Sequence, residues 1–370
     1  MVQQKQQPPL KSASGGRARI PYDGLADSLG LPIYGGYSIA DPKALDLAPW
    51  PEWGVKTAFL QLEGMPTICE SRITEIAAGS TSEPMKQAVS EIVYVLDGQG
   101  TATLWAGDGP KQTFEWQKTS LFILPRNTWF QLSSASGSPA RLLSYNHRPL
   151  AMTSLPDFNL HFKGPLEEPR LIYGDSGVFD LEPKLVKSAS SNGGGEGDYW
   201  NVNLIPQLDA WDNFAPNPGR GAGGKITRVE FPAAEMNCHL SAFGPGLYKK
   251  AHKHGGGRVI VVTKGEGYAV LTPFPGMQGE RQVCQLEEGS IFVPPDNWYH
   301  QHFNTGSDEI RLLVMHPLRQ FSGDPYRHQI EYPDEEPWVR ETFAQELAKK
   351  GRTSAMPPAA YENADFKWPA

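Results

Sequence analysis

The chain has 370 residues, of which 39% are hydrophobic and 20% are charged, and this length and composition suit a globular protein of two domains. Its formal net charge of −7 argues against nucleic acid or an anionic membrane surface as a partner. No hydrophobic run is long enough to span a bilayer, and three cysteines without CxxC spacing indicate a reduced, cytoplasmic protein with buried thiols.

The first 53 residues are predicted to form a tail and an arm. Residues 1–20 carry four basic side chains and no acid, and they lack the apolar segment of a signal peptide, which predicts a disordered tail. Residues 21–53 are rich in glycine, proline and aromatic side chains, as expected of an arm that packs on a barrel. With the strands that follow, this arm is assigned to a first domain at residues 21–150.

Short strands separated by turns are predicted from Lys56 onward. The 38 glycines and 33 prolines of the chain favour many short strands over long helices. Runs rich in β-branched and aromatic residues predict the strands of a small antiparallel barrel at 57–62, 67–76, 91–98, 100–105, 120–125 and 141–145.

A second set of strands, at residues 226–330, repeats the first set after a long connection at residues 151–225. Within that connection, the serine- and glycine-rich residues 188–197 predict a flexible loop. In the second set, Arg258 stands 167 positions after Glu91, and Ser290 stands 170 positions after Ser120, each in a matching strand. Matching strands in the same order at nearly one offset predict an internal duplication.

One helix is predicted in the last segment, residues 331–370. Asp334 is expected to be its N-cap, with acidic residues in the first turn. Apolar side chains recur at helical spacing at Trp338 or Val339, Phe343 and Leu347. We expect this helix to have a packing role only.

Three histidines form the candidate functional site. His252 and His254 are two positions apart, so on a strand both side chains point to the same face. His300, from a second predicted strand, could complete a site of three nitrogen ligands. The alternative is that these histidines are only hydrogen-bonded inside a barrel. We predict one divalent metal ion per chain on the three histidines, with Fe(II) expected and Mn, Zn, Ni or Cu as alternatives.

The second half resembles the cupin superfamily in two motifs. The first motif has a Gly, a His-x-His pair, an acid and a Gly at fixed spacing, and the second has a Gly, a Pro-x-Gly, a His and an Asn. The matching residues are Gly246, His252, His254, Arg258 and Gly265, and then Gly289, Pro295, Asn297, His300 and Asn304. The resemblance implies an all-β fold of two tandem cupin barrels (double-stranded β-helix, jelly-roll), with an N-terminal arm and a C-terminal helix.

The chain departs from the cupin motifs at two places. Arg258 stands where the family has a glutamate ligand, so a site with an inward Arg258 would favour an anion that binds both the metal and the guanidinium. Alternatively, Arg258 turns outward and pairs with a surface acid. In the first half Glu91 is kept, but the histidine positions fall within residues 84–87 and at Phe130, which predicts that the first barrel binds no metal.

Side chains near the three histidines are further candidates. His302 is two positions after His300 and shares its face of the strand, where it is either a proton-moving residue or a structural one. His239 and Tyr248 are weaker candidates for the pocket.

The pattern Trp298-x-His300-x-His302 is similar to that of gentisate 1,2-dioxygenase and its relatives, which are bicupins with a three-histidine Fe(II) site. This resemblance implies a dioxygenase that acts on a small hydroxy-aromatic carboxylate, with Arg258 holding the carboxylate and His302 moving protons. The alternatives are a metal-dependent hydrolase, lyase or isomerase, and a non-catalytic cupin that binds a sugar or another small molecule. The expected partners are a small anionic substrate, dioxygen and further copies of the chain in a homodimer or higher oligomer.

Overall fold

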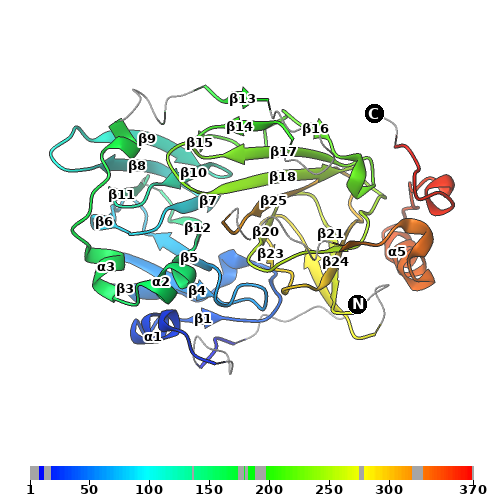
Figure 1. Ribbon diagram of the computed structural model, residues 1–370, viewed down its shortest axis with the longest axis horizontal. Helices are drawn as coiled ribbons and strands as arrows, with labels where there is room; N and C mark the ends of the chain where they lie inside the picture. The colour runs from blue at the N-terminus through cyan, green and yellow to red at the C-terminus, as the bar shows by residue number, and fades with distance from the viewer. Residues whose placement is uncertain are drawn as a thin grey trace.

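The structure is a computed structural model that describes residues 8–11, 18–135, 137–173, 179, 182–187, 197–274, 279–318 and 328–368. Strands dominate these residues and helices are few and short. The strands form two barrels side by side, the first mostly in blue to cyan and the second in green to orange (Figure 1). The predicted all-β architecture of two tandem barrels is confirmed.

The first barrel consists of a large and a small sheet. The large sheet has the order β1-β4-β5-β12-β7-β10-β15, with β3 beside β4, and the small sheet has the order β6-β11-β8-β9. The strands of these two sheets are β1 (Ile33–Tyr34), β3 (Ala48–Trp50), β4 (Val55–Leu60), β5 (Glu70–Ile76), β6 (Met85–Lys86), β7 (Glu91–Asp97), β8 (Gln99–Trp105), β9 (Gln112–Gln117), β10 (Leu121–Leu124), β11 (Trp129–Ser134), β12 (Ala140–Asn146) and β15 (Leu204–Ile205).

The second barrel is built in the same way. Its large sheet has the order β13-β14-β17-β18-β25-β20-β23-β2, with β16 beside β17, and its small sheet has the order β22-β21-β24-β19-β26. The strands are β2 (Ser38–Ile39), β13 (Lys184–Val186), β14 (Tyr199–Asn201), β16 (Ala215–Pro216), β17 (Lys225–Glu230), β18 (Asn237–Phe243), β19 (His252–Lys253), β20 (Val259–Lys264), β21 (Gly267–Thr272), β22 (Gln282–Leu286), β23 (Ile291–Phe292), β24 (Tyr299–Asn304), β25 (Ile310–Met315) and β26 (His328–Gln329).

The two barrels repeat one another strand by strand. The order β4-β5-β12-β7-β10 of the first barrel corresponds to β17-β18-β25-β20-β23 of the second. Even an irregularity recurs, because the register shifts between Arg141 and Leu142 in the first barrel and between Val262 and Lys264 in the second. The shared order and shared register shift agree with the internal duplication that the sequence predicts.

Each barrel receives one strand from outside its own half. β2, in the N-terminal arm, pairs with β23 of the second barrel, whereas β15, in the connection between the halves, pairs with β10 of the first. Both added strands cover an edge of a large sheet and satisfy backbone groups that would otherwise face solvent. The arm therefore packs on both barrels, which it joins through backbone hydrogen bonds.

Short helices lie outside the barrels. They are α1 (Pro21–Ser28), α2 (Arg148–Ser154), α3 (Phe158–Lys163), α4 (Arg170–Tyr173) and α5 (Pro337–Lys349), together with the 3-10 turns η1 (Pro42–Ala44), η2 (Pro218–Arg220), η5 (Tyr332–Asp334) and η6 (Pro358–Tyr361). Within the described residues, no helix has the length and apolar composition needed to cross a membrane. Most of the predicted flexible loop, residues 188–196, lies outside the described residues, as do residues 1–7 and 12–17 of the predicted tail.

The C-terminal helix α5 begins later than predicted. Its N-cap is Glu336, whereas the predicted N-cap, Asp334, ends the 3-10 turn η5. The physical reason is Pro337, which occupies the first helical position and keeps the preceding residue in an extended conformation. The buried face consists of Val339, Phe343 and Leu347, so Val339 rather than Trp338 is the first inward position.

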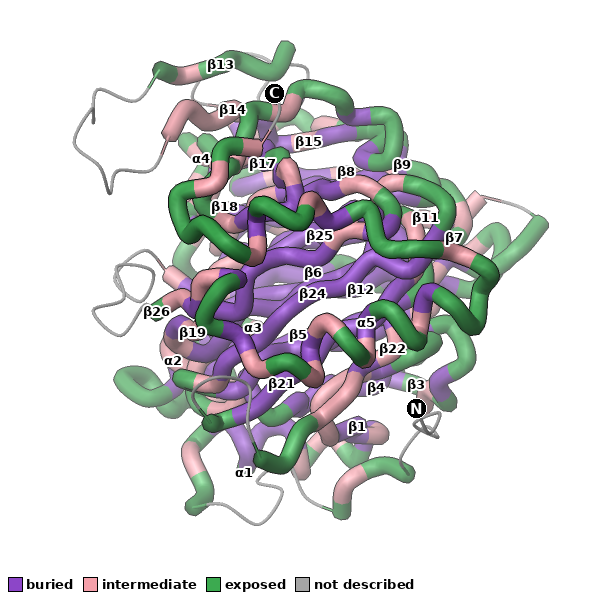
Figure 2. The backbone as a smooth tube through the Cα atoms, turned by 90° about the vertical axis from the view of Figure 1, so that its right-hand side faces the viewer, coloured by how far each residue is buried: buried purple, intermediate pink, exposed green. Residues whose placement is uncertain are grey.

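Buried strands fill the centre of the molecule and exposed segments surround them (Figure 2). Cys69, Cys238 and Cys284 are all buried free thiols, as predicted. The outward face of the small sheet of the second barrel packs against α5 through Tyr248 and Phe303. The inward face of the same sheet carries the histidines of the candidate site.

Candidate metal centre

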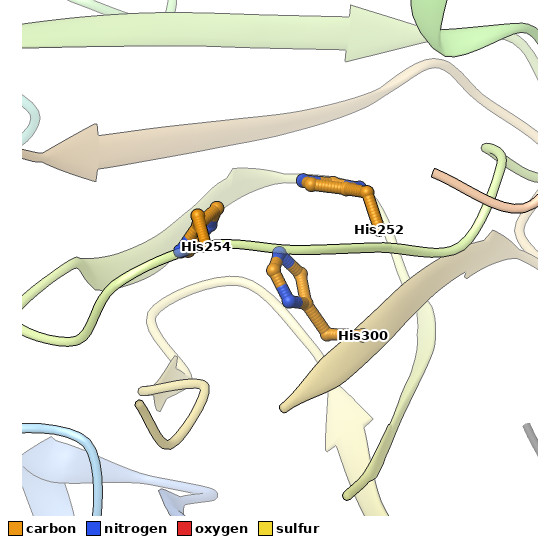
Figure 3. Close-up of side chains that lie close together, drawn as sticks. All are labelled: His252, His254 and His300. Carbon is orange, nitrogen blue, oxygen red and sulfur yellow. The ribbon is translucent and has the colours of Figure 1, made fainter. Parts of the chain in front are cut away.

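Two neighbouring strands bring the three histidines together. His252 on β19 is the direct antiparallel partner of His300 on β24, and His254 follows the end of β19. One ligand nitrogen from each ring lies within 4.8 Å of the others. Figure 3 shows the three rings turned toward one another. The predicted convergence of His252, His254 and His300 is therefore confirmed, and all three side chains are buried.

Backbone carbonyls orient all three rings. Nδ1 of His254 lies 2.9 Å from the carbonyl oxygen of Gly255, and those of His252 and His300 lie 3.3 and 3.4 Å from carbonyl oxygens. A carbonyl oxygen only accepts, so Nδ1 of His252 and of His300 carries the proton and donates. Nδ1 of His254 lies between two partners, the acceptor oxygen of Gly255 and the donor Nη1 of Arg258 at 3.0 Å, and it donates to Gly255 when it carries the proton. In that state each Nε2 keeps a free lone pair, which a metal ion requires. The residues present therefore fit a divalent ion bound by three imidazoles.

The surroundings keep these rings neutral. Burial lowers the pKa of His300 to about 3. Burial, the neighbouring His300 and the guanidinium of Arg258 hold the pKa of His254 well below its ordinary value. With their pKa values lowered in this way the imidazoles are neutral at pH 7, and neutral imidazole is the form that binds a metal ion.

Arg258 lies inside the barrel, immediately beside the histidines. It is 7% exposed, and its Nη1 atom donates to the carbonyl oxygen of Gly255 at 2.6 Å, 3.0 Å from Nδ1 of His254. Of the two directions that the sequence left open, the side chain takes the inward one. It brings a permanent positive charge next to a site that already favours a cation.

His302 lies inside the same barrel but outside the three-histidine group. Its ring centroid is 5.5 Å from that of His300 and 6.4 Å from that of His252. The Nε2 atom of His302 is buried and has no hydrogen-bond partner among the described residues. A buried polar atom without a partner is costly, so this atom is suited to contact a ligand or water.

Lys249 is a site residue that the sequence reading missed. It is 4% exposed, and its ammonium group donates to the hydroxyl of Ser241 on the inward face of β18. Burial, with the charge of Arg220 as a smaller cause, lowers the pKa of Lys249 to about 7. The sequence offered one indication of this role, the position of Lys249 three residues before His252. Lysine side chains are usually exposed, and the burial of this one follows only from the fold.

Acidic side chains are missing from the strands around these cationic groups. The described strands β18 to β25 contain no Asp or Glu at any position. Their inward positions provide the polar side chains His239, Ser241, His300 and His302, together with apolar side chains such as Phe292, whose ring centroid lies 5.4 Å from that of His302. The polar part of the barrel interior is therefore electropositive before any metal is considered.

The weaker candidates have different positions. His239 lies on the inward face, where its Nδ1 is 2.6 Å from Nε2 of His316. Tyr248 lies on the outward face of the small sheet, in the apolar cluster that packs against α5, and its hydroxyl donates to the carboxylate of Glu335. It therefore faces away from the three histidines. Tyr299 also faces outward, with its hydroxyl 2.9 Å from Nδ1 of His328.

A surface pocket of about 320 Å³ opens next to the site, lined by Asn217, Gly219, Arg220, His328 and Gln329. Gln329 is the strand partner of His252, and Arg220 donates to Gln329 at 2.9 Å. The pocket therefore lies at the outer edge of the strand that carries His252, and none of the three histidines lines it.

The corresponding position of the first barrel is filled by an ion-pair network. Phe130 pairs with Met85 there, as His300 pairs with His252 in the second barrel. Glu91, at the position that corresponds to Arg258, accepts from Arg72 at 2.5 and 2.6 Å. Two buried arginines, Arg72 and Arg148, thus neutralise the buried carboxylates, and Arg148 also donates to the side chains of Glu70 and Gln87.

The duplicated strand order and the histidine positions decide the architecture. The chain consists of two tandem barrels of the same strand order, and its histidine positions resemble those of the cupin motifs. Of the two barrels, the described residues of the second provide the metal-ligand group. The place of the motif glycine is taken by Asn297 at φ +60°, a left-handed conformation that asparagine tolerates better than most residues.

Known proteins resemble this chain in part. No family model matches the chain. Auxin-binding proteins T85 and T92 of Nicotiana tabacum are 33% and 30% identical over 98 residues, which are 25% of this chain and 52% of each relative. The chain thus spans about half the length of the curated relatives it matches.

Solved structures show a more distant likeness. Two variants of the oxalate decarboxylase of Bacillus subtilis are 14% and 13% identical with TM-scores of 0.49, over 88% and 90% of this chain and 85% and 87% of theirs. A 7S globulin of Momordica charantia is 13% identical with a TM-score of 0.43, over 75% of this chain and 83% of its own. At such scores the description of the fold rests on the strand order of this chain alone.

Proposed function

We propose that this bicupin is a metal-dependent enzyme whose second barrel binds one divalent ion and a small carboxylate substrate. The observation that carries the proposal is the composition of the barrel interior. Three neutral imidazoles converge beside Arg258 and Lys249, while strands β18 to β25 contain no acid. A cationic interior with a metal requires anions from outside the chain.

The residues of the site have separate roles in this proposal. His252, His254 and His300 hold the ion, which supplies Lewis acidity or a site for dioxygen when it is bound. Arg258 pairs with the substrate carboxylate through charge-assisted hydrogen bonds. His302 provides the unpartnered Nε2 atom that holds or moves a proton at the substrate.

The reaction that we propose first is Fe(II)-dependent ring cleavage of a hydroxy-aromatic carboxylate by dioxygen. Three neutral ligands leave several positions of an iron ion open, as a chelating hydroxy-acid together with dioxygen requires. The tobacco relatives are named for binding auxin, which is itself a small carboxylic acid. That name supports the carboxylate class of ligand.

A non-oxidative reaction is the second candidate, and Lys249 favours it. An amine with a pKa of about 7 is a base of suitable strength for a lyase or isomerase that uses Zn or Mn as a Lewis acid. Such a reaction needs no dioxygen, and that difference separates the two candidates.

The test uses the full chain, purified without oxygen and reloaded with Fe(II), Mn(II) or Zn(II) in turn. Each form is mixed with 2,5-dihydroxybenzoate or 2-hydroxybenzoate while oxygen uptake and ultraviolet spectra are recorded. Oxygen uptake with Fe(II) alone supports the dioxygenase, and turnover with Zn or Mn without oxygen uptake supports the second candidate. If no ion binds and no carboxylate changes the spectrum of any form, the proposal is wrong.

A further inference from the structure

The short loop between two residues of the metal centre is held by the other barrel. Gly255, Gly256 and Gly257 connect His254 to Arg258. Gly257 has φ +84°, a conformation that favours glycine, so the loop has a sharply defined shape. The partners of this loop include residues of the first barrel, which is separated from it by more than a hundred positions in the sequence.

Hydrogen bonds fix the loop from two sides. The backbone N–H of Gly257 donates to the carbonyl oxygen of Gly64 at 2.7 Å. The hydroxyl of Tyr145, on β12 of the first barrel, donates to the carbonyl oxygen of Gly257 at 2.7 Å. From the second barrel, Asp296 accepts the backbone N–H of Gly256 at 3.0 Å.

Close packing removes the remaining freedom of the loop. A Cβ atom at Gly257 would lie 2.6 Å from the side chain of Ile68, and one at Gly256 would lie 2.9 Å from the carbonyl oxygen of Gly64. Both distances are shorter than side chains tolerate, so the loop is seated against residues 64–68 without a gap. Tyr145 is completely buried at this contact.

The held loop contains the group that orients a metal ligand. The carbonyl oxygen of Gly255 accepts from Nδ1 of His254 and from Arg258. A shift of this peptide would turn the ring of His254 and move the guanidinium together with it. Groups that orient a metal-binding histidine commonly change metal affinity by about 10- to 100-fold.

We propose that the first barrel helps to form the metal centre. Its residues Tyr145 and Ile68 position the Gly255–Gly257 loop, and the loop in turn positions His254 and Arg258. This inference rests on the metal centre of the proposed function. It assigns a task to a barrel whose own metal position is filled by arginines. Tyr145 is a positioning residue here, since it contacts the loop and not the ion.

The test measures Co(II) binding to metal-free full-length chain by titration and by the visible spectrum of the bound ion, which reports ligand geometry. Tyr145→Phe removes the hydrogen bond to Gly257, together with a longer hydroxyl contact of 3.4 Å to His147 within the first barrel, and should weaken Co(II) binding about tenfold or more and change the spectrum. Tyr94→Phe is the matched control, because Tyr94 is a buried tyrosine of β7 in the same barrel and makes none of the hydrogen bonds that hold the loop. It should leave both readouts unchanged.

Ile68→Ala provides a second variant at a partly exposed position in case Tyr145→Phe does not fold. It removes the packing against Gly257 and should change the Co(II) spectrum in the same direction. The inference is overturned if the folded variants bind Co(II) with the affinity and spectrum of the unmodified chain. Failure of the unmodified chain to bind Co(II) would overturn the metal centre itself, which is a distinguishable result.

Discussion

Arg258 and His254 share one acceptor: both donate to the carbonyl oxygen of Gly255, at 2.6 and 2.9 Å. The shared acceptor places the guanidinium next to the ring, 3.0 Å from Nδ1 of His254. The residue at the position of the acid in the cupin motif thus places a positive charge beside a histidine ligand instead of supplying an oxygen ligand. We therefore expect a substitution at Arg258 to change the binding of the metal ion and the binding of the substrate differently.

Replacing Arg258 should affect anions and metal in opposite directions. In Arg258→Ala, 2-hydroxybenzoate should bind the metal-loaded chain about tenfold more weakly or worse, because a charge-assisted pair is lost. The divalent ion should bind as tightly as before or more tightly, because a nearby positive charge is removed. Isothermal titration with each ligand measures both effects.

Lys264→Ala, at the exposed end of the same strand, is the charge-matched control. Unchanged affinity for the anion in Arg258→Ala would contradict the role given to the guanidinium.

Metal content should be one ion per chain and should depend on the second barrel. Elemental analysis after reloading should give one equivalent for the unmodified chain and nearly none for His300→Ala, since two ligands hold a divalent ion poorly. His328→Ala removes an exposed histidine from the neighbouring strand and should retain the ion. Two equivalents in the unmodified chain would show that the first barrel also binds metal, contrary to the prediction from its sequence.

Lys249 should make stability depend on pH above neutrality. Its pKa falls from 10.5 when exposed to about 7 when folded, so between these values the unfolded chain binds more protons than the folded chain does. Burial of this amine therefore costs no stability above about pH 10.5, where the amine is neutral in both states. The cost grows as pH falls toward 7, because the unfolded chain then gains a proton that the folded chain does not.

Lys249→Met should consequently stabilise the chain most near pH 7, on the order of a few kcal/mol, and least near pH 10. Urea unfolding at both pH values measures the difference, with Lys264→Met as the exposed control. A gain in stability that is equal at both pH values would show that the amine of Lys249 is not buried as described.

The ion-pair network of the first barrel should be required for folding and not for the chemistry. Arg72→Met leaves Glu70 and Glu91 buried with one cation fewer, which should destabilise the chain by about 3–5 kcal/mol. The affinity of the remaining folded chain for Co(II) should be unchanged, because Arg72 makes none of the hydrogen bonds that hold the Gly255–Gly257 loop. Guanidinium unfolding and metal titration check the two statements separately. A loss of metal affinity without a loss of stability would reverse this assignment.

Much of the architecture was determined by the sequence itself. Alternating strands separated by Gly and Pro, repeated at one offset, predicted two barrels, because side-chain period and turn chemistry are local properties. The spacing of His252, His254 and His300 predicted a shared site for the same reason, since residues two apart on a strand share a face. The preference of aspartate for N-cap positions predicted the wrong helix start at Asp334, because Pro337 fixes the N-cap at Glu336.

Other features were decided only by tertiary structure, because they depend on what surrounds a side chain. The direction of Arg258, the burial of Lys249 and the outward position of Tyr248 follow from which face of a strand meets the barrel interior. The hydrogen bond from Tyr145 to Gly257 joins residues 112 positions apart, and no local pattern encodes it. Sequence thus determined which residues could form a metal centre, and packing of one barrel against the other decided how that centre is held.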